Sequence, residues 1–207
     1  WLQDDAGVPL TSIDWVQAGT EDKDRPEKVE LNLPKGLNIT RIRDKTLSEM
    51  IVTGEVDAIM TASIPSPYVQ KNPNIQRLFP NAREEEEAYF KRTGIWPIMH
   101  VMAMRRDILD QYPWLARNLY LAFDKSKQNS VKRLFASGVS LYPMPWVRDE
   151  VDYLKDLFGG DFFPFGIDEN RKTLEAFLKW SFEQGIAKRH MTPEEIFPAG
   201  INPSVKT

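Results

Sequence analysis

Residues 37–62 follow a strand, helix, strand order, and this order limits the possible folds more than any other feature of the sequence. "LNITRI" at 37–42 alternates as a strand does, and "VDAIMTA" at 56–62 is apolar enough for a buried strand. Between them, "TLSE" at 46–49 is a capping box that opens a short helix ending at Gly54. Such a unit brings its strands together in parallel, so we expect an α/β fold.

The second half of the chain has mostly helical patterns. An earlier strand is predicted at 12–16, and "IWPIMHVMAMRRD" at 95–107 is apolar and compatible with another. We predict a charged helix at 83–94 and further helices from Pro113, over 147–158, from Asp168 to Gly185, and at a second capping box, 192–195. The expected inward residues of the helices from Pro113 and Asp168 are Leu115, Leu119, Phe123, Leu174, Phe177, Leu178 and Phe182.

Composition excludes several classes of function. The 207 residues carry a net charge of -3 with the two signs interspersed, which does not fit a nucleic-acid-binding stripe. Cysteine is absent, and no apolar run is long enough to span a membrane. The two histidines are 90 positions apart without carboxylates at ligand spacing, and no glycine-rich phosphate loop occurs. We therefore expect no metal, no cofactor and no nucleic-acid partner.

The candidate site residues lie in two stretches. In "RTGIWPIMH" at 92–100, His100 is either a core histidine or a proton donor beside a cleft, and Arg92 is either a surface charge or a clamp for a carboxylate. Thr61 lies near the end of the strand predicted at 56–62, and Ser63 and Ser66 follow that strand. Ligands bind at the carboxyl ends of parallel strands, so these hydroxyls are candidate contacts, although singly each is a common loop residue.

Four segments resemble the 4,5-dihydroxyphthalate decarboxylase family. They are "RPEKVELNLP" (25–34), "LSEMIVTGEVDAIMTA" (47–62), the run from "EEAYFKRTGIWPIMH" to "AFDKSK" (86–127), and "DFFPFGIDENRKTLEAFLKWSFEQG" (161–185). This family resembles type II periplasmic solute-binding proteins, which have two α/β lobes and a ligand cleft between them. The resemblance implies that residues 1–94 are the remainder of lobe two and that 95–207 return to lobe one. It also implies that an N-terminal segment is missing, which would leave apolar surface exposed for self-association.

The family resemblance implies a cofactor-free decarboxylation of an aromatic carboxylic acid, as part of bacterial aromatic catabolism. His100 would donate the proton, Arg92 would hold a carboxylate, and Thr93, Thr61, Ser63 and Ser66 would add hydrogen bonds. One departure concerns Ser63, because we expect relatives to have an arginine there. The alternative is a periplasmic receptor for a small organic acid that serves an ABC transporter, whereas the enzyme would be cytoplasmic. A ligand-sensing regulatory domain is a third interpretation.

Overall fold

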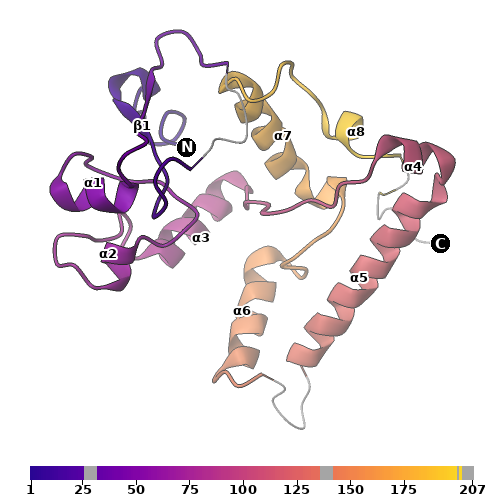
Figure 1. Cartoon of the computed structure of the whole chain (residues 1–207). Coiled ribbons are helices and arrows are strands. Elements are labelled where there is room, and N and C mark those ends of the chain that lie inside the picture. Colours follow the sequence, from indigo (N-terminus) through magenta and orange to yellow (C-terminus); the bar gives the residue numbers. More distant parts are fainter. Residues whose placement is uncertain (26–31, 136–141, 200, 202–207) are drawn as a thin grey trace. The chain divides into compact units, whose positions relative to one another are not determined.

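The computed structural model describes residues 1–25, 32–135, 142–199 and 201. The chain divides into two compact units, one of Trp1–Thr93 with Trp180–Arg189 (unit 1) and one of Gly94–Lys179 with His190–Thr207 (unit 2). The described residues form many helices and one small sheet, which is consistent with the predicted α/β class (Figure 1). The type II two-lobe architecture and the assignment of 1–94 and 95–207 to its lobes stay predictions, and most of "RPEKVELNLP" lies outside the described residues.

A two-stranded parallel sheet organises unit 1. A 3₁₀ turn (Leu10–Ser12) precedes β1 (Trp15–Gln17), which pairs in parallel with β2 (Ile39–Arg41) so that Trp15 lies opposite Ile39. The strands predicted at 12–16 and 37–42 are thus confirmed in part: β1 begins three residues later and ends one residue later than predicted, and β2 is shorter than predicted.

Helix α1 (Leu47–Thr53) begins at the predicted capping box. The Glu49 N–H donates to Thr46 Oγ1 at 3.1 Å, and the Thr46 N–H donates to the Glu49 carboxylate at 2.8 Å. The helix ends at Gly54, whose φ of 75° is the left-handed conformation of a glycine stop. Helices α2 (Ser66–Val69) and α3 (Ala82–Thr93) follow, and α3 confirms the predicted charged helix.

Two predicted strands are wrong. Residues 56–62 and 95–107 form no strand in the described structure; the first run is loop, and 94–105 is irregular chain that leads into α4 (Arg106–Gln111). A strand exists only where a neighbour takes up its backbone hydrogen bonds, and these apolar runs pair with no described strand. Their side chains are correspondingly open: Met60 is 83% exposed and Met99 is 79% exposed.

Unit 2 contains α4, α5 (Trp114–Leu134), α6 (Val147–Phe158), α8 (Pro193–Ile196) and α7 (Ile167–Glu183), whose last four residues belong to unit 1. Helices α5 and α6 contact each other and run in opposite directions (Figure 1). Leu174 and Leu178 are buried as predicted, with Val151 and Ile167. The inward placement of Phe123, Phe177 and Phe182 is wrong, since they are 43%, 62% and 44% exposed. The described elements thus leave part of the apolar surface of α5 and α7 uncovered.

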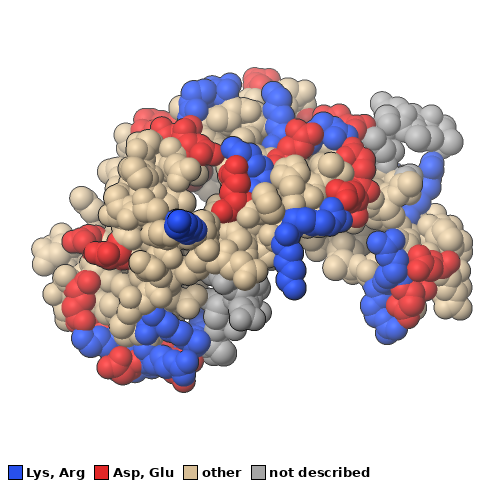
Figure 2. All heavy atoms as spheres, turned by 90° about the horizontal axis from the view of Figure 1, so that it is seen from above, with Lys and Arg blue, Asp and Glu red and all other residues tan. Residues whose placement is uncertain are grey.

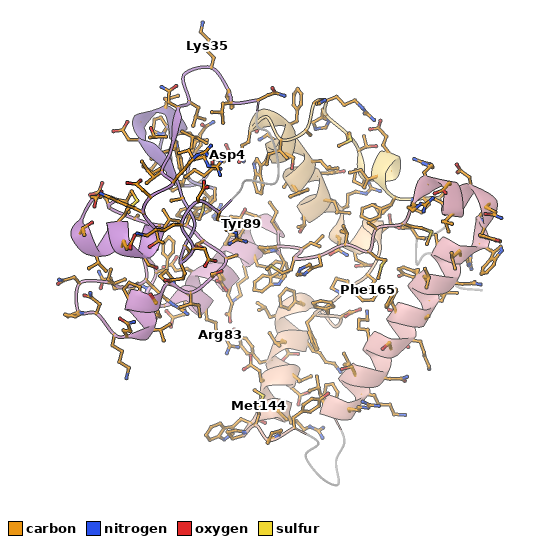
Figure 3. All side chains as sticks on the ribbon, in the orientation of Figure 1. Asp4, Lys35, Arg83, Tyr89, Met144 and Phe165 are labelled. Atoms are coloured by element: carbon orange, nitrogen blue, oxygen red, sulfur yellow. The ribbon has the colours of Figure 1, made fainter. Side chains whose placement is uncertain are left out.

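Polar contacts connect α5 to the chain before α7. Lys127 Nζ lies 2.6 Å from the Asp161 carboxylate and 4.9 Å from the ring centre of Phe165, which is labelled in Figure 3. Elsewhere, basic and acidic side chains are intermixed over the visible face (Figure 2). No helix in the described part of the chain is long and apolar enough to cross a membrane.

Gly185 and Gly54 provide a test of the packing in unit 1. Their φ angles are 76° and 75°, but a Cβ on Gly185 would lie 1.7 Å from the Asn32 carbonyl oxygen, while one on Gly54 would meet nothing within 4 Å. Gly54→Ala should therefore cost only the conformational term, about 1–2 kcal/mol. Gly185→Ala adds a backbone clash and should cost about 2–5 kcal/mol. Urea unfolding of both variants measures the difference, and equal losses would contradict the close approach.

Candidate functional site

The candidate site lies at the carboxyl end of the parallel sheet in unit 1. Residues 18–21 follow β1, and the start of α1 follows β2, so both connections leave the sheet at the same edge. Open parallel sheets bind ligands outside this edge, because the loops there converge without blocking one another. The site is therefore built from loops that the two strands position.

A tight loop after β1 anchors the start of α1. The carbonyl oxygens of Gly19 and Thr20 accept hydrogen bonds from the N–H groups of Leu47 and Ser48 at 2.9 and 3.1 Å. Both Gly19 and Thr20 are buried. A Cβ on Gly19 would lie 2.0 Å from the carbonyl oxygen of Asp22, so the loop closes this tightly only with glycine.

The same loop gathers the three hydroxyl residues that the sequence predicted. The hydroxyl oxygens of Thr20 and Thr61 are 2.7 Å apart, and the Ser63 N–H donates to Thr61 Oγ1 at 3.2 Å. Ser66 donates twice to Glu21, from its N–H at 2.7 Å and its hydroxyl at 3.0 Å. The Ser63 hydroxyl is exposed and makes no hydrogen bond to any described residue. Of the three, Ser63 thus has the hydroxyl that a ligand can reach without breaking a bond.

Glu21 is the acidic member of this cluster. Besides the two bonds from Ser66, its carboxylate accepts the Ser48 hydroxyl at 2.6 Å. These hydrogen bonds, first from the Ser48 hydroxyl and then from the Ser66 N–H, lower the pKa of Glu21. All the donors are neutral, and within the described residues Glu21 forms no ion pair. The cluster therefore carries a negative charge that no described cation offsets.

Arg92 and Thr93 lie in the last turn of α3, also in unit 1. The two terminal nitrogens of Arg92 donate to the two Asp5 oxygens at 2.8 and 2.6 Å, and the guanidinium lies 5.4 Å from the ring centre of Tyr89 (labelled in Figure 3). The bonds to Asp5 raise the pKa of Arg92 and lower that of Asp5. Thr93 Oγ1 donates to the Tyr89 carbonyl oxygen at 2.8 Å. Arg92 thus already holds a carboxylate in two-point geometry, and that carboxylate is Asp5.

His100 belongs to unit 2 and is exposed. The chain before it is anchored, because the Trp96 N–H donates to Thr173 Oγ1 at 3.1 Å and the Trp96 ring meets Phe158 edge-on at 5.1 Å. The interpretation of His100 as a core histidine in a buried strand is wrong. Its imidazole is open to solvent, and its role as a proton donor stays a prediction.

The sequence reasoning missed Thr20, Glu21 and Ser48. Their common signal is position: Thr20 and Glu21 come directly after a strand, and Ser48 lies in the first turn of the helix after the next strand. No group of three or more His, Cys, Asp or Glu residues in the described ranges is placed to hold a metal ion.

The pKa of Glu21 predicts a pH dependence of stability. A carboxyl whose pKa is lower in the folded state contributes stability above the ordinary glutamate pKa of about 4.3. That stability is lost as the pH falls through the folded value. The difference in melting temperature between wild type and Glu21→Gln should be larger at pH 7 than at pH 3, measured by circular dichroism. A difference that is constant over this range would contradict the three hydrogen bonds.

Comparison with known proteins gives two relatives of this chain, while no family model matches it. A protein of Comamonas testosteroni named 4,5-dihydroxyphthalate decarboxylase is 30% identical over 203 residues, which are 97% of this chain and 62% of that protein. A Pseudomonas putida protein of the same name is 32% identical over 80 residues, which are 38% of this chain and 31% of that protein. The chain thus spans less than two thirds of the relatives it matches, and it is similar over almost its whole length to a protein that carries this name.

Proposed function

We propose that this protein is a decarboxylase-like enzyme that releases CO₂ from an aromatic carboxylic acid without a metal or organic cofactor. The observation that carries the proposal is the 30% identity over 97% of the chain with a protein named 4,5-dihydroxyphthalate decarboxylase. The first candidate substrate is accordingly 4,5-dihydroxyphthalate, a benzene ring with two adjacent carboxylates and two adjacent hydroxyls. For the residues outside the 80-residue match to the Pseudomonas putida protein, the proposal rests on the similarity to the Comamonas testosteroni protein.

The chemistry needs a proton and a fixed carboxylate. The ring–carboxylate bond breaks, CO₂ departs, and the ring carbon that keeps the electron pair takes a proton. A hydroxyl para to the leaving carboxylate can donate electrons into the ring, so the reaction does not strictly require a metal or an organic cofactor. The protein has to orient the acid and supply the proton, which positioned side chains can do.

His100 is the proposed proton donor. An imidazole can donate a proton to a bound ligand, and the exposure of His100 leaves this residue open to one. The hydroxyls of unit 1 would orient the substrate by hydrogen bonds, with Ser63 as the direct contact. The predicted cleft between two lobes is part of the proposal and rests on the family resemblance.

Arg92 is the proposed carboxylate partner. Its guanidinium would have to exchange Asp5 for the substrate, because the Asp5 carboxylate occupies the fork. Both side chains reach solvent, with 59% of Arg92 and 19% of Asp5 exposed, so the pair itself adds little stability.

Removing the competing carboxylate tests Arg92. Asp5→Asn should lower KM for 4,5-dihydroxyphthalate severalfold, and Arg92→Ala should raise it tenfold or more, as expected for a charged hydrogen bond of roughly 1.5–3 kcal/mol. Lys91→Ala, which removes the neighbouring cation of α3, is the matched control for a general charge effect. Identical KM shifts in Lys91→Ala and Arg92→Ala would contradict the specific role.

Removing the imidazole tests the proton donor. His100→Ala should lower kcat by about two orders of magnitude or more, since general acid catalysis contributes about 10²–10⁴-fold. His190→Ala, which removes the only other histidine, should leave kcat within twofold. The measurement is CO₂ release from 4,5-dihydroxyphthalate and related aromatic acids, with thermal-shift stabilisation followed in parallel. Unchanged turnover in His100→Ala would eliminate its role.

The same assay separates the enzyme from a receptor. Stabilisation by an acid without CO₂ release would support the periplasmic receptor for an organic acid and would overturn the decarboxylase. Release of CO₂ would support the enzyme. The two outcomes are distinct for each acid tested.

A further inference from the structure

We propose that Glu21 and the hydroxyls around it recognise the adjacent hydroxyl groups of an aromatic ligand, and that they discriminate against carboxylates. The inference rests on the proposed function for its ligand class, since it assigns one end of a dihydroxy aromatic acid to this cluster. Glu21 is thereby a specificity-determining residue of the site at the end of the sheet.

Glu21 gives the cluster a negative charge. Among the described residues, Ser48 and Ser66 hold Glu21 through neutral donors, and Glu21 remains exposed. An anionic ligand group placed here would meet an unpaired negative charge and lose its own hydration. A phenolic hydroxyl would instead donate a charge-assisted hydrogen bond, which is about twice as strong as a neutral one.

The Glu21 carboxylate has an acceptor position that its hydrogen bonds to described residues leave open. Glu21 Oε1 accepts from the Ser48 hydroxyl and the Ser66 N–H, whereas the one described donor to Oε2 is the Ser66 hydroxyl. A carboxylate offers about four lone-pair sites, two on each oxygen. Oε2 therefore keeps one acceptor position for a ligand, and the donors of Ser48 and Ser66 are already used.

Hydrogen bonds between distant parts of the sequence and two prolines limit the motion of the cluster. The hydrogen bonds join residues that are 27 to 45 positions apart in the sequence, from Thr20 and Glu21 to Thr61, to Ser48 in α1 and to Ser66 in α2. Pro65 and the buried Pro67 limit the backbone on either side of Ser66. The Ser63 hydroxyl, which no described residue binds, is the second group that a catechol oxygen can contact. We assign one phenolic hydroxyl to Glu21 Oε2 and the adjacent one to the Ser63 hydroxyl.

The test compares ligands that differ only in their hydroxyls and carboxylates. The probes are 4,5-dihydroxyphthalate, phthalate and catechol, and the measurement is the dissociation constant by isothermal titration calorimetry at pH 7. We expect Glu21→Gln to weaken binding of catechol and of 4,5-dihydroxyphthalate by about tenfold, as for loss of a charged hydrogen bond. Binding of phthalate should be unchanged or tighter, because a negative charge is removed. Glu55→Gln, which changes an exposed glutamate paired with Lys45 in the same unit, is the matched control and should change none of the three.

A purely structural role of Glu21 would weaken all three probes together, and that result would overturn the inference. Ser63→Ala provides a second variant if Glu21→Gln unfolds, because it breaks no hydrogen bond of the Ser63 hydroxyl to a described residue. It should weaken catechol about threefold or more and spare phthalate, and equal effects on both would again overturn the inference.

Ligand binding and CO₂ release together distinguish a failure of the Glu21 role from a failure of the decarboxylase function. Catechol binding that depends on Glu21, without CO₂ release from any acid, would support this inference and overturn the decarboxylase. Release of CO₂ with a hydroxyl preference that Glu21→Gln leaves intact would do the reverse. Absence of catechol binding by wild type would overturn the inference whatever the turnover.

Discussion

The loop after β1 is the constraint on which the candidate site depends. Gly19 closes it, and the carbonyl oxygens of Gly19 and Thr20 seat the first turn of α1. Glu21 then ties that turn to the start of α2 through Ser48 and Ser66. Together with the hydrogen bond between the Thr20 and Thr61 hydroxyls, these bonds hold the segment that carries Thr61, Ser63 and Ser66 at the edge of the sheet.

Much of the helical structure follows from the sequence because helix signals are local. The capping boxes at Thr46 and Thr192 and the stop at Gly54 each act within a few residues, and the structure confirms all three. Strands are different, since they need a partner that periodicity does not specify. The apolar runs at 56–62 and 95–107 have strand composition, but in the described structure they form no ladder.

The site was predictable in part for the same reason. The sequence indicates Thr61, Ser63 and Ser66 because they lie at the end of the apolar run 56–62 or just after it. The structure brings them together although that run is not a strand. Glu21 lies 45 residues before Ser66, and only the tertiary structure brings the two together. The role of Arg92 as a clamp for a substrate carboxylate stays a prediction, and no local pattern identifies Asp5, 87 positions earlier, as the carboxylate it holds in the structure.

The serine at position 63 fits the charge of the cluster. The family resemblance leads us to expect an arginine there, two residues after Thr61 and three before Ser66. A guanidinium would add a positive charge to this segment, which suits a ligand carboxylate. Ser63 leaves the Glu21 charge unpaired, so this edge of the sheet favours ligand groups that donate hydrogen bonds. If that expectation holds, a serine at position 63 keeps this segment without the positive charge, while the hydrogen bonds of Glu21 keep its geometry.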